Sequence, residues 1–206
     1  MRADNWQEYV LNDSAFVEFP PRTLVLDVGC GSGTQPRDLR QRGCVGIGIE
    51  PDWLCLVNCQ NHGLNVLQAI AEELPVKTSS LDGAICKAVI PYTDECRALS
   101  EICRVLKRGA VCHFCDHGAG YYLRYLLCGP SWKFRFYGLR TLANTWVYAM
   151  TGRRSPRFLG DTVYQTRRRL AAYYRKNGLR LLQGSPSRTF LGLPVFIYHS
   201  VRKAAA

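Results

Sequence analysis

A glycine-rich turn follows the first apolar run of the chain, and its spacing is typical of a loop that binds a small molecule. Residues 24–33 read LVLDVGCGSG, with Gly29, Gly31 and Gly33 at alternate positions after a short β-branched run. Glycines so placed allow a tight turn and a close approach of the backbone to a ligand. A P-loop requires a Gly-Lys-Ser/Thr ending, whereas Gly33 is followed by Thr34, and a dinucleotide fingerprint places its third glycine one residue later.

Asp27 narrows the choice of ligand. A carboxylate two residues before the first glycine tends to repel a pyrophosphate, but it suits a ligand that presents an ammonium group or a pair of hydroxyls near the strand end. S-adenosylmethionine is such a ligand. The run Asp27-Val28-Gly29-Cys30-Gly31-Ser32-Gly33 resembles the first motif of class I S-adenosylmethionine-dependent methyltransferases.

Further motifs follow at the offsets that this family leads one to expect. Glu50 ends a second buried run, VGIGIEPD over residues 45–52, and lies 21 positions after Gly29, where a ribose diol needs an acceptor. Residues 71–75, AEELP, resemble the adenine-side loop, and residues 82–109 resemble the fourth strand and the helix after it. The resemblance implies cofactor contacts from Asp27, Gly29, Cys30, Gly31, Gly33, Glu50, Pro51, Ala71, Glu72 and Lys87.

Two positions depart from the family pattern. Ile70 stands where the adenine-side loop has an aspartate, so backbone groups or Glu72 must accept the hydrogen bond of the adenine amino group. Ile90-Pro91-Tyr92 stands where many small-molecule members have Leu-Glu-His and where members that methylate nucleobase amines or glutamine amides have Asp/Asn-Pro-Pro-Tyr. Tyr92 is interpreted either as a wall of the acceptor pocket or as a loop tyrosine that only packs.

Methyl transfer from a sulfonium is an in-line displacement with a good leaving group, so the main task is to hold the acceptor about 3 Å from the methyl group. An aliphatic hydroxyl needs a base, whereas a carboxylate, a thiolate or a neutral amine needs little more than positioning. Asp116 and His117 leave the fifth strand in CDHGAGYY and are the candidate bases, unless Asp116 caps the next helix and His117 lies at the surface. The remaining candidates are Tyr121 for catalysis, and Tyr92, Tyr122 and Arg124 for contact with the acceptor.

Strand and helix signals alternate along the chain, and the resemblance implies a single doubly wound, mostly parallel seven-stranded α/β sheet. The strands are expected at 24–28, 44–49, 65–70, 83–89, 110–115, 179–182 and 195–201. The helices are expected at 34–42, at 52–61, from Thr93 or Asp94 to Gly109, and from a Thr162 or Asp161 cap through Lys176 with Gln165 as the capping-box partner.

The length of 206 residues favours one domain over two. We expect a single methyltransferase domain over 1–206, with an N-terminal helical segment at 1–22, a cofactor-binding half at 23–116, a helical lid at 117–160, and a final helix and two strands at 161–203. Within the lid, residues 121–148 carry nine aromatic residues, four Lys/Arg and no acid. They predict aromatic side chains packed on the sheet, an aromatic-walled pocket with arginines that steer an anionic group, or a face on a membrane interface.

The positive charge is confined to the second part of the chain. Residues 1–120 carry 11 Lys/Arg and 15 Asp/Glu, whereas residues 121–206 carry 16 and 1. This excess indicates an anionic partner: a small or lipid-linked acceptor first, and RNA as the weaker alternative, since no Asn/Asp-Pro-Pro-Tyr motif or added RNA-binding domain accompanies it. Ile70 and the altered end of strand four also allow a non-catalytic partner subunit that only binds S-adenosylmethionine, and the aromatic lid could pair two copies in a homodimer.

The ten cysteines are interpreted as reduced thiols. MRADNWQEYVLND has no apolar core of a signal peptide, and no run is long enough to cross a membrane, so a cytoplasmic protein is expected. Contact of residues 121–148 with a membrane surface is one of the alternatives for that segment. Cys112 and Cys115 point to opposite faces of a strand, and the helical set Cys55, Cys59 and His62 supplies only three ligands. No metal site is therefore expected.

Overall fold

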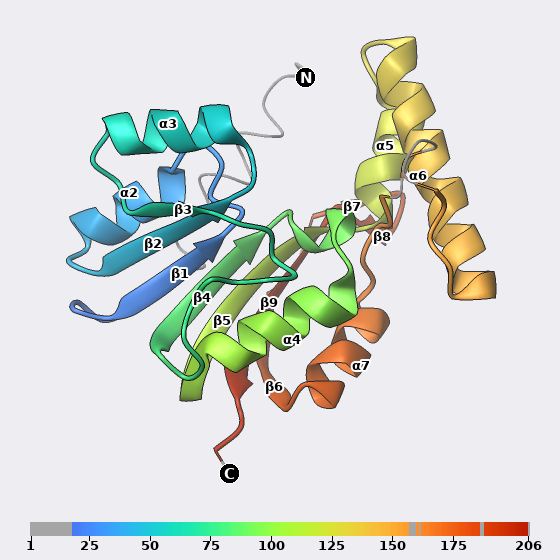
Figure 1. The fold of residues 1–206 in the computed structure, drawn as a ribbon. Helices are drawn as coiled ribbons and strands as arrows, with labels where there is room; N and C mark the ends of the chain where they lie inside the picture. The colour runs from blue at the N-terminus through green and yellow to red at the C-terminus, as the bar shows by residue number, and fades with distance from the viewer. Residues whose placement is uncertain (1–17, 157–159, 161, 186–187, 206) are drawn as a thin grey trace.

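The computed structural model describes residues 18–156, 160, 162–185 and 188–205. Helices and strands alternate through this part of the chain (Figure 1). The first half contains β1 (Leu24–Val28), α2 (Thr34–Gln41), β2 (Val45–Glu50), α3 (Trp53–Asn61), β3 (Val66–Gln68), β4 (Leu81–Lys87), the 3₁₀ turn η3 (Ile90–Tyr92), α4 (Glu95–Val105) and β5 (Leu106–His117). The second half contains α5 (Ala119–Cys128), α6 (Trp132–Thr151), α7 (Arg167–Lys176), β6 (Leu179–Ser185), β7 (Thr189–Phe190), β8 (Leu193–Pro194) and β9 (Phe196–Lys203).

Seven of these strands form one sheet in the order β3-β2-β1-β4-β5-β9-β6. β1 to β5 pair in parallel, and β9 runs antiparallel to both of its neighbours. The doubly wound, mostly parallel seven-stranded sheet expected from the sequence is therefore confirmed. From β1 the sheet is extended first on one side by β2 and β3 and then on the other side by β4 and β5, so the strand order reverses between β1 and β4. In open sheets of this kind, ligands bind beyond the carboxyl ends of the strands at such a point.

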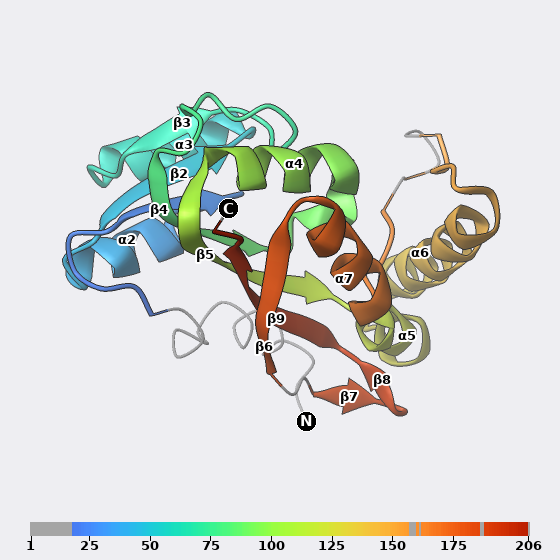
Figure 2. The ribbon, with the colours of Figure 1, turned by 90° about the horizontal axis from the view of Figure 1, so that it is seen from below.

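Helices cover both faces of the sheet, with α4 on one side and α2 on the other (Figure 2). The larger core lies under α4 and α7, where Leu99, Phe114 and Tyr174 are buried together. The smaller core lies under α2 and contains Val25, Leu39 and Ile85. Because both faces are covered, the central strands are continuous apolar runs, as a buried parallel sheet requires.

The boundary between α4 and β5 lies at a different residue from the one predicted. The sequence indicated a helix to Gly109 and a strand at 110–115, but α4 ends at Val105 and β5 begins at Leu106. Leu106 pairs with Leu81, and the register then shifts before Val111 pairs with Gly83. Gly109 has a φ of 78° inside this irregularity, so it accommodates the shift in the strand and does not end the helix.

The last helix also begins later than predicted. Thr166 caps α7 by accepting a hydrogen bond from the Arg169 amide, whereas Thr162 and Gln165 were expected to form the cap and Asp161 lies outside the described residues. The segment before α7 is extended because its amides bind elsewhere in the fold. The Val163 amide donates to the Pro91 carbonyl at 3.1 Å, and the Gln165 amide donates to the His117 carbonyl at 3.0 Å.

The insertion after β5 is helical, as predicted, and consists of α5 and α6. α6 stands out from the body at the edge of the molecule, in both views (Figures 1 and 2). Gly138 allows the close approach of the two helices, since a Cβ there would lie 2.5 Å from the Tyr122 carbonyl oxygen. Among the helices that the structure describes, none is both long and apolar enough to cross a bilayer. The N-terminal helical segment expected at 1–22 falls largely on residues 1–17, outside the described residues, and residues 18–22 contain a turn.

We predict that Gly33→Ala destabilises the fold, since Gly33 has a φ of 80° and an added Cβ would lie 2.4 Å from Leu64 Cδ1. Backbone strain and overpacking together should lower the free energy of unfolding by about 2 to 4 kcal/mol in urea denaturation. The control is Gly178→Ala, which has a similar φ of 68° but no atom within 4 Å of the new Cβ. Equal losses in the two variants would contradict the packing part of the argument.

Candidate functional site

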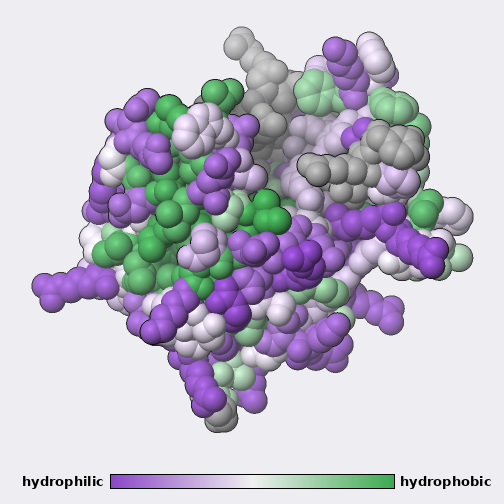
Figure 3. All heavy atoms as spheres, viewed as in Figure 1, coloured by the Kyte–Doolittle hydropathy of each residue, from purple (hydrophilic) through white to green (hydrophobic). Residues whose placement is uncertain are grey.

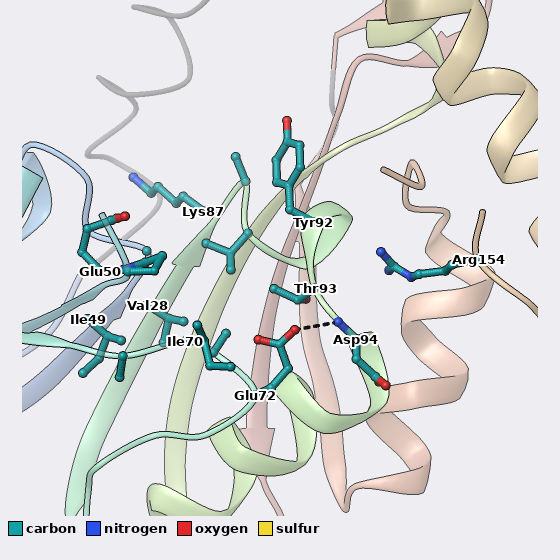
Figure 4. Close-up of a pocket in the computed structure, with 16 residues that line it drawn as sticks. Val28, Ile49, Glu50, Ile70, Glu72, Lys87, Tyr92, Thr93, Asp94 and Arg154 are labelled. Carbon is teal, nitrogen blue, oxygen red and sulfur yellow. Dashed lines mark hydrogen bonds between the residues drawn. The ribbon is translucent and has the colours of Figure 1, made fainter. Parts of the chain in front are cut away.

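A cavity of about 730 Å³ opens at the carboxyl ends of β1, β2 and β4. Figure 4 shows its side chains arriving from several elements, with Glu50 and Lys87 at one end and Arg154 at the other. The space-filling view shows apolar residues gathered over α3 and β3, beside the more hydrophilic surface of α4 and α7 (Figure 3). The lining residues are Val28, Gly29, Ile49, Glu50, Pro51, Ala69, Ile70, Ala71, Glu72, Lys87, Ala88, Val89, Tyr92, Thr93, Asp94 and Arg154.

The glycine turn fixes the position of the Glu50 carboxylate. The Gly31 amide donates a hydrogen bond of 2.9 Å to Glu50 Oε2, and the Asp52 amide donates one of 3.1 Å to Oε1. The turn needs its glycines, because Gly29 has a φ of 74° and a Cβ there would lie 2.3 Å from Val89 Cγ2. Each carboxylate oxygen of Glu50 keeps a lone pair for a hydroxyl of a ligand in the cavity.

Asp27 lies beneath the turn and is 2% exposed. Burial raises the pKa of its carboxyl to about 7; the Lys87 ammonium counteracts this effect, and the Glu50 carboxylate adds to it. Asp27 therefore changes charge near neutral pH. Cys30, in contrast, packs against Cys59 and Leu64 and belongs to the core, and its burial raises the pKa of the thiol.

The opposite wall of the cavity is formed by the loop after β3. Ile70 is 48% exposed and lines the cavity, and Ala71 is buried beside it. The Glu72 carboxylate accepts a hydrogen bond of 2.9 Å from the Asp94 amide, which ties this loop to the start of α4 (Figure 4). Asp94, one of the two cap residues that the sequence left open, caps α4 by accepting a hydrogen bond from the Arg97 amide.

Arg154 is a cavity residue that sequence reasoning missed. Its guanidinium forms an ion pair of 2.8 Å with Glu95, and the two side chains are 18% and 3% exposed. The Gln165 amide group donates to the other oxygen of Glu95 at 3.4 Å. Because Arg154 follows α6 whereas Glu95 begins α4, only the tertiary fold brings the basic segment to the cavity.

An aromatic cluster borders the cavity behind Tyr92. His117 stacks on Tyr121 with ring centroids 4.1 Å apart, and Tyr122 and Tyr92 present their rings edge-on to His117. The Tyr92 and Tyr137 hydroxyl oxygens lie 3.3 Å apart. Burial lowers the pKa of His117 to about 4, so its ring is neutral at pH 7 and is a weak base.

Asp116 lies on the other face of β5, since neighbouring residues of a strand alternate. It is fully buried near Cys86 and Tyr174, and its carboxyl has no side-chain hydrogen-bond partner among the described residues. Burial raises its pKa to about 8, an effect that the Ile90 amide counteracts and Glu95 increases. Asp116 does not cap α5, whose N-cap residue is Gly118.

The structure thus divides the predicted site residues into two groups. Seven of them line the cavity: Gly29, Glu50, Pro51, Ala71, Glu72, Lys87 and Tyr92. The others lie under the glycine turn or in the region of β5 and α5: Asp27, Cys30, Gly31, Gly33, Asp116, His117, Tyr121, Tyr122 and Arg124. Lining residues such as Ala88 and Val89 follow directly from their place after a strand, whereas Thr93 and Asp94 were expected only as a helix cap.

None of the groups of His, Cys, Asp and Glu side chains in the described ranges is arranged to hold a metal ion. All ten cysteines are free thiols, and six of them are buried.

The sequence and the fold both match known proteins. Residues 26–114 match a protein-family model described as "Methyltransferase domain". An uncharacterized methyltransferase of Mycobacterium tuberculosis is 30% identical over 87 residues, which make up 41% of this chain and 36% of that relative. The chain thus matches only about a third of the length of this curated relative.

Solved structures match over almost the whole chain. An S-adenosylmethionine-dependent methyltransferase from Mesorhizobium loti matches with a TM-score of 0.69 at 16% identity. The match covers 96% of this chain and 97% of the Mesorhizobium loti chain. Another from Methanosarcina mazei matches with a TM-score of 0.65 at 20% identity. This match covers 93% of this chain and 96% of the Methanosarcina mazei chain. At these identities the likeness shows the fold.

We predict that Asp116→Asn raises stability in a pH-dependent way. The unfolded carboxyl ionises near its ordinary pKa of 3.8, whereas the folded one keeps its proton to about 8. The free energy of unfolding of the parent should therefore fall, relative to that of the variant, as the pH rises between those values, by at least about 1 kcal/mol in total.

Urea denaturation from pH 4 to pH 8 measures this difference. It should grow with pH for Asp116→Asn and stay flat for Glu73→Gln, a change at an exposed acid. A constant difference for Asp116→Asn would mean that Asp116 is ionised in the folded protein.

Proposed function

We propose that the chain, whose residues 26–114 match a methyltransferase-domain family model and whose fold matches S-adenosylmethionine-dependent methyltransferases, transfers a methyl group from that cofactor to an oxygen or nitrogen atom of a small or lipid-linked, anionic acceptor. The observation that carries the proposal is the cavity itself. It joins the glycine turn, the fixed Glu50 carboxylate and the aromatic cluster at the point where the strand order reverses.

The residues of the cavity fit S-adenosylmethionine, which when bound supplies an electrophilic methyl group on a sulfonium. The volume of about 730 Å³ is in the usual range for small-molecule sites. Glu50 would accept the ribose hydroxyls, since two amides already orient its carboxylate. Lys87 would supply a positive charge for the carboxyl group of the methionine part, and Ile70 and Ala71 would supply an apolar wall for adenine. Asp27 lies beneath the glycine turn, outside the cavity lining, and would act on the amino group only through the turn.

The weakness of the available bases supports an acceptor that needs no general base. Asp116 holds its proton at neutral pH and lies away from the cavity, and His117 has a pKa of about 4. Neither side chain is suited to removing the proton of an aliphatic hydroxyl at pH 7. A carboxylate or a neutral amine needs positioning only, and Tyr92, with His117 and Tyr121 behind it, offers an aromatic surface against which the acceptor would be held.

An anionic acceptor matches the charge of the chain. Arg154 lines the cavity, and residues 121–206 carry 16 Lys/Arg against 1 acid. The same charge supports RNA as the second candidate acceptor, which salt-sensitive RNA binding would favour. We place the protein in the cytoplasm because none of its ten cysteines forms a disulfide.

The first experiment is calorimetric titration with S-adenosylhomocysteine. We expect micromolar binding by the parent chain and at least about tenfold weaker binding by Glu50→Ala, or about 1.4 kcal/mol. Glu73→Ala is the matched control, because it removes an exposed carboxylate from the neighbouring loop outside the cavity. Absence of binding by the parent chain would contradict the proposal, whereas binding without methyl transfer to any acceptor would favour a non-catalytic partner subunit.

We further predict that Ile70→Asp tightens S-adenosylhomocysteine binding. The new carboxylate would accept a hydrogen bond from the adenine amino group, worth about 1 kcal/mol or roughly fivefold at this half-exposed position. Leu54→Asp is the control, since it places a carboxylate at an exposed apolar position outside the cavity. Equal effects of the two variants would show that overall charge, and not a specific acceptor, changes the affinity.

A further inference from the structure

An exposed apolar stripe runs along the whole of α6. At about 100° per residue, its members fall within an arc of about 100° on the helix surface. Trp132, Trp146 and Met150 are 72%, 68% and 70% exposed, and no described residue covers them. The α6 stripe consists of Trp132, Phe136, Leu139, Ala143, Trp146, Val147 and Met150.

The opposite face of α6 is small and polar, and it is the face that packs on the rest of the fold. Gly138, Thr141, Asn144 and Thr145 are the buried residues of the helix. The Thr145 hydroxyl accepts a hydrogen bond from the Tyr164 amide at 3.0 Å, and the Asn144 side chain donates to the Gly160 carbonyl. These contacts fix the rotation of α6, so the α6 stripe cannot turn inward without breaking them.

The surroundings of the α6 stripe are basic. Between Asp116 and Asp161 the chain contains seven Lys/Arg and no acid. At the same 100° per residue, Arg135 borders one side of the stripe, and Arg140 and Lys133 border the other. Lys133 and Arg135 are exposed.

We propose that the α6 stripe docks on an anionic lipid surface, with α6 lying in the plane of the membrane interface. An apolar stripe with tryptophans near both ends and an exposed cation on each border, Arg135 on one and Lys133 on the other, is the pattern of an interfacial helix. The exposed position of α6 at the edge of the molecule leaves the helix accessible to a flat surface (Figure 1). A second copy of the chain fits less well, because its own α6 region is equally basic and offers no acidic partner to these cations.

This inference is independent of methyl transfer, although it favours a lipid-linked acceptor within the proposed function. Vesicle binding needs no cofactor, so a chain that fails to bind S-adenosylhomocysteine can still be tested for docking. Each of the two proposals can therefore be contradicted without affecting the other.

The test is sedimentation with vesicles of phosphatidylcholine alone and of phosphatidylcholine mixed with phosphatidylserine. We expect the chain to bind the mixed vesicles and to bind the neutral ones at least about tenfold more weakly. The double variant W132S/W146S should bind the mixed vesicles at least about tenfold more weakly, whereas Trp53→Ser, which removes a 60% exposed tryptophan from α3, should bind like the parent.

The charge requirement has its own variant pair. Lys133→Glu with Arg135→Glu should weaken binding to mixed vesicles about tenfold or more, and Arg108→Glu with Arg180→Glu, at exposed positions away from α6, should weaken it less. Circular dichroism and the unfolding midpoint check that each variant is folded.

Equal binding to both vesicle types, or binding unaffected by W132S/W146S, would overturn the proposal. So would the absence of vesicle binding, whether the chain is a monomer by analytical ultracentrifugation or a dimer that W132S/W146S dissociates.

Discussion

The turn over residues 29–33 is held against the end of β2 by backbone hydrogen bonds. The amides of Gly29 and Cys30 both donate to the Ile49 carbonyl, at 2.8 and 3.0 Å, and the Gly31 amide donates to Glu50. Since β1 and β2 are joined in this way, the Glu50 carboxylate is fixed before any ligand arrives. A preorganised acceptor of this kind lowers the entropic cost of binding.

Ionisable groups lie beside this turn and at the far end of the cavity. Asp27 and Lys87 lie near Glu50, so two acidic groups and one basic group meet at one end of the cavity. At the other end the Arg154–Glu95 ion pair connects the segment after α6 to the first turn of α4. Breaking a buried pair leaves an uncompensated charge, which makes this contact a firm link between the segment after α6 and the start of α4.

The α5–α6 pair has a core of its own, which is largely aromatic. Tyr121, Tyr122 and Phe196 pack together beside His117 and close the region between α5 and the end of β5. α6 adds Tyr137 to this cluster but turns its larger apolar side chains outward. The same helix thus supports the aromatic cluster behind Tyr92 and presents an apolar surface to the outside.

The sequence by itself determined the elements that depend on local pattern. The apolar run ending at Val28, the glycine turn, Glu50 at the end of the second strand and the Asp94 cap were all predictable, because each depends on residues a few positions apart. The predicted boundaries of elements were wrong where contacts with distant residues decide them. Gly109 accommodates a shift in the register of β5 against β4. The amides of Val163 and Gln165 donate to the carbonyls of Pro91 and His117, so α7 begins later than predicted.

Only the tertiary structure decided how the candidate site is assembled. Asp116 and His117 are neighbours in sequence, yet the alternation of β5 sends the first into the core and the second to the aromatic cluster. Arg154 reaches the cavity because the segment after α6 passes beside the first turn of α4, where Arg154 pairs with Glu95. No local sequence pattern predicts this contact. The outward rotation of the α6 stripe is likewise fixed by Gly138, Thr141, Asn144 and Thr145, whose small polar side chains pack inward.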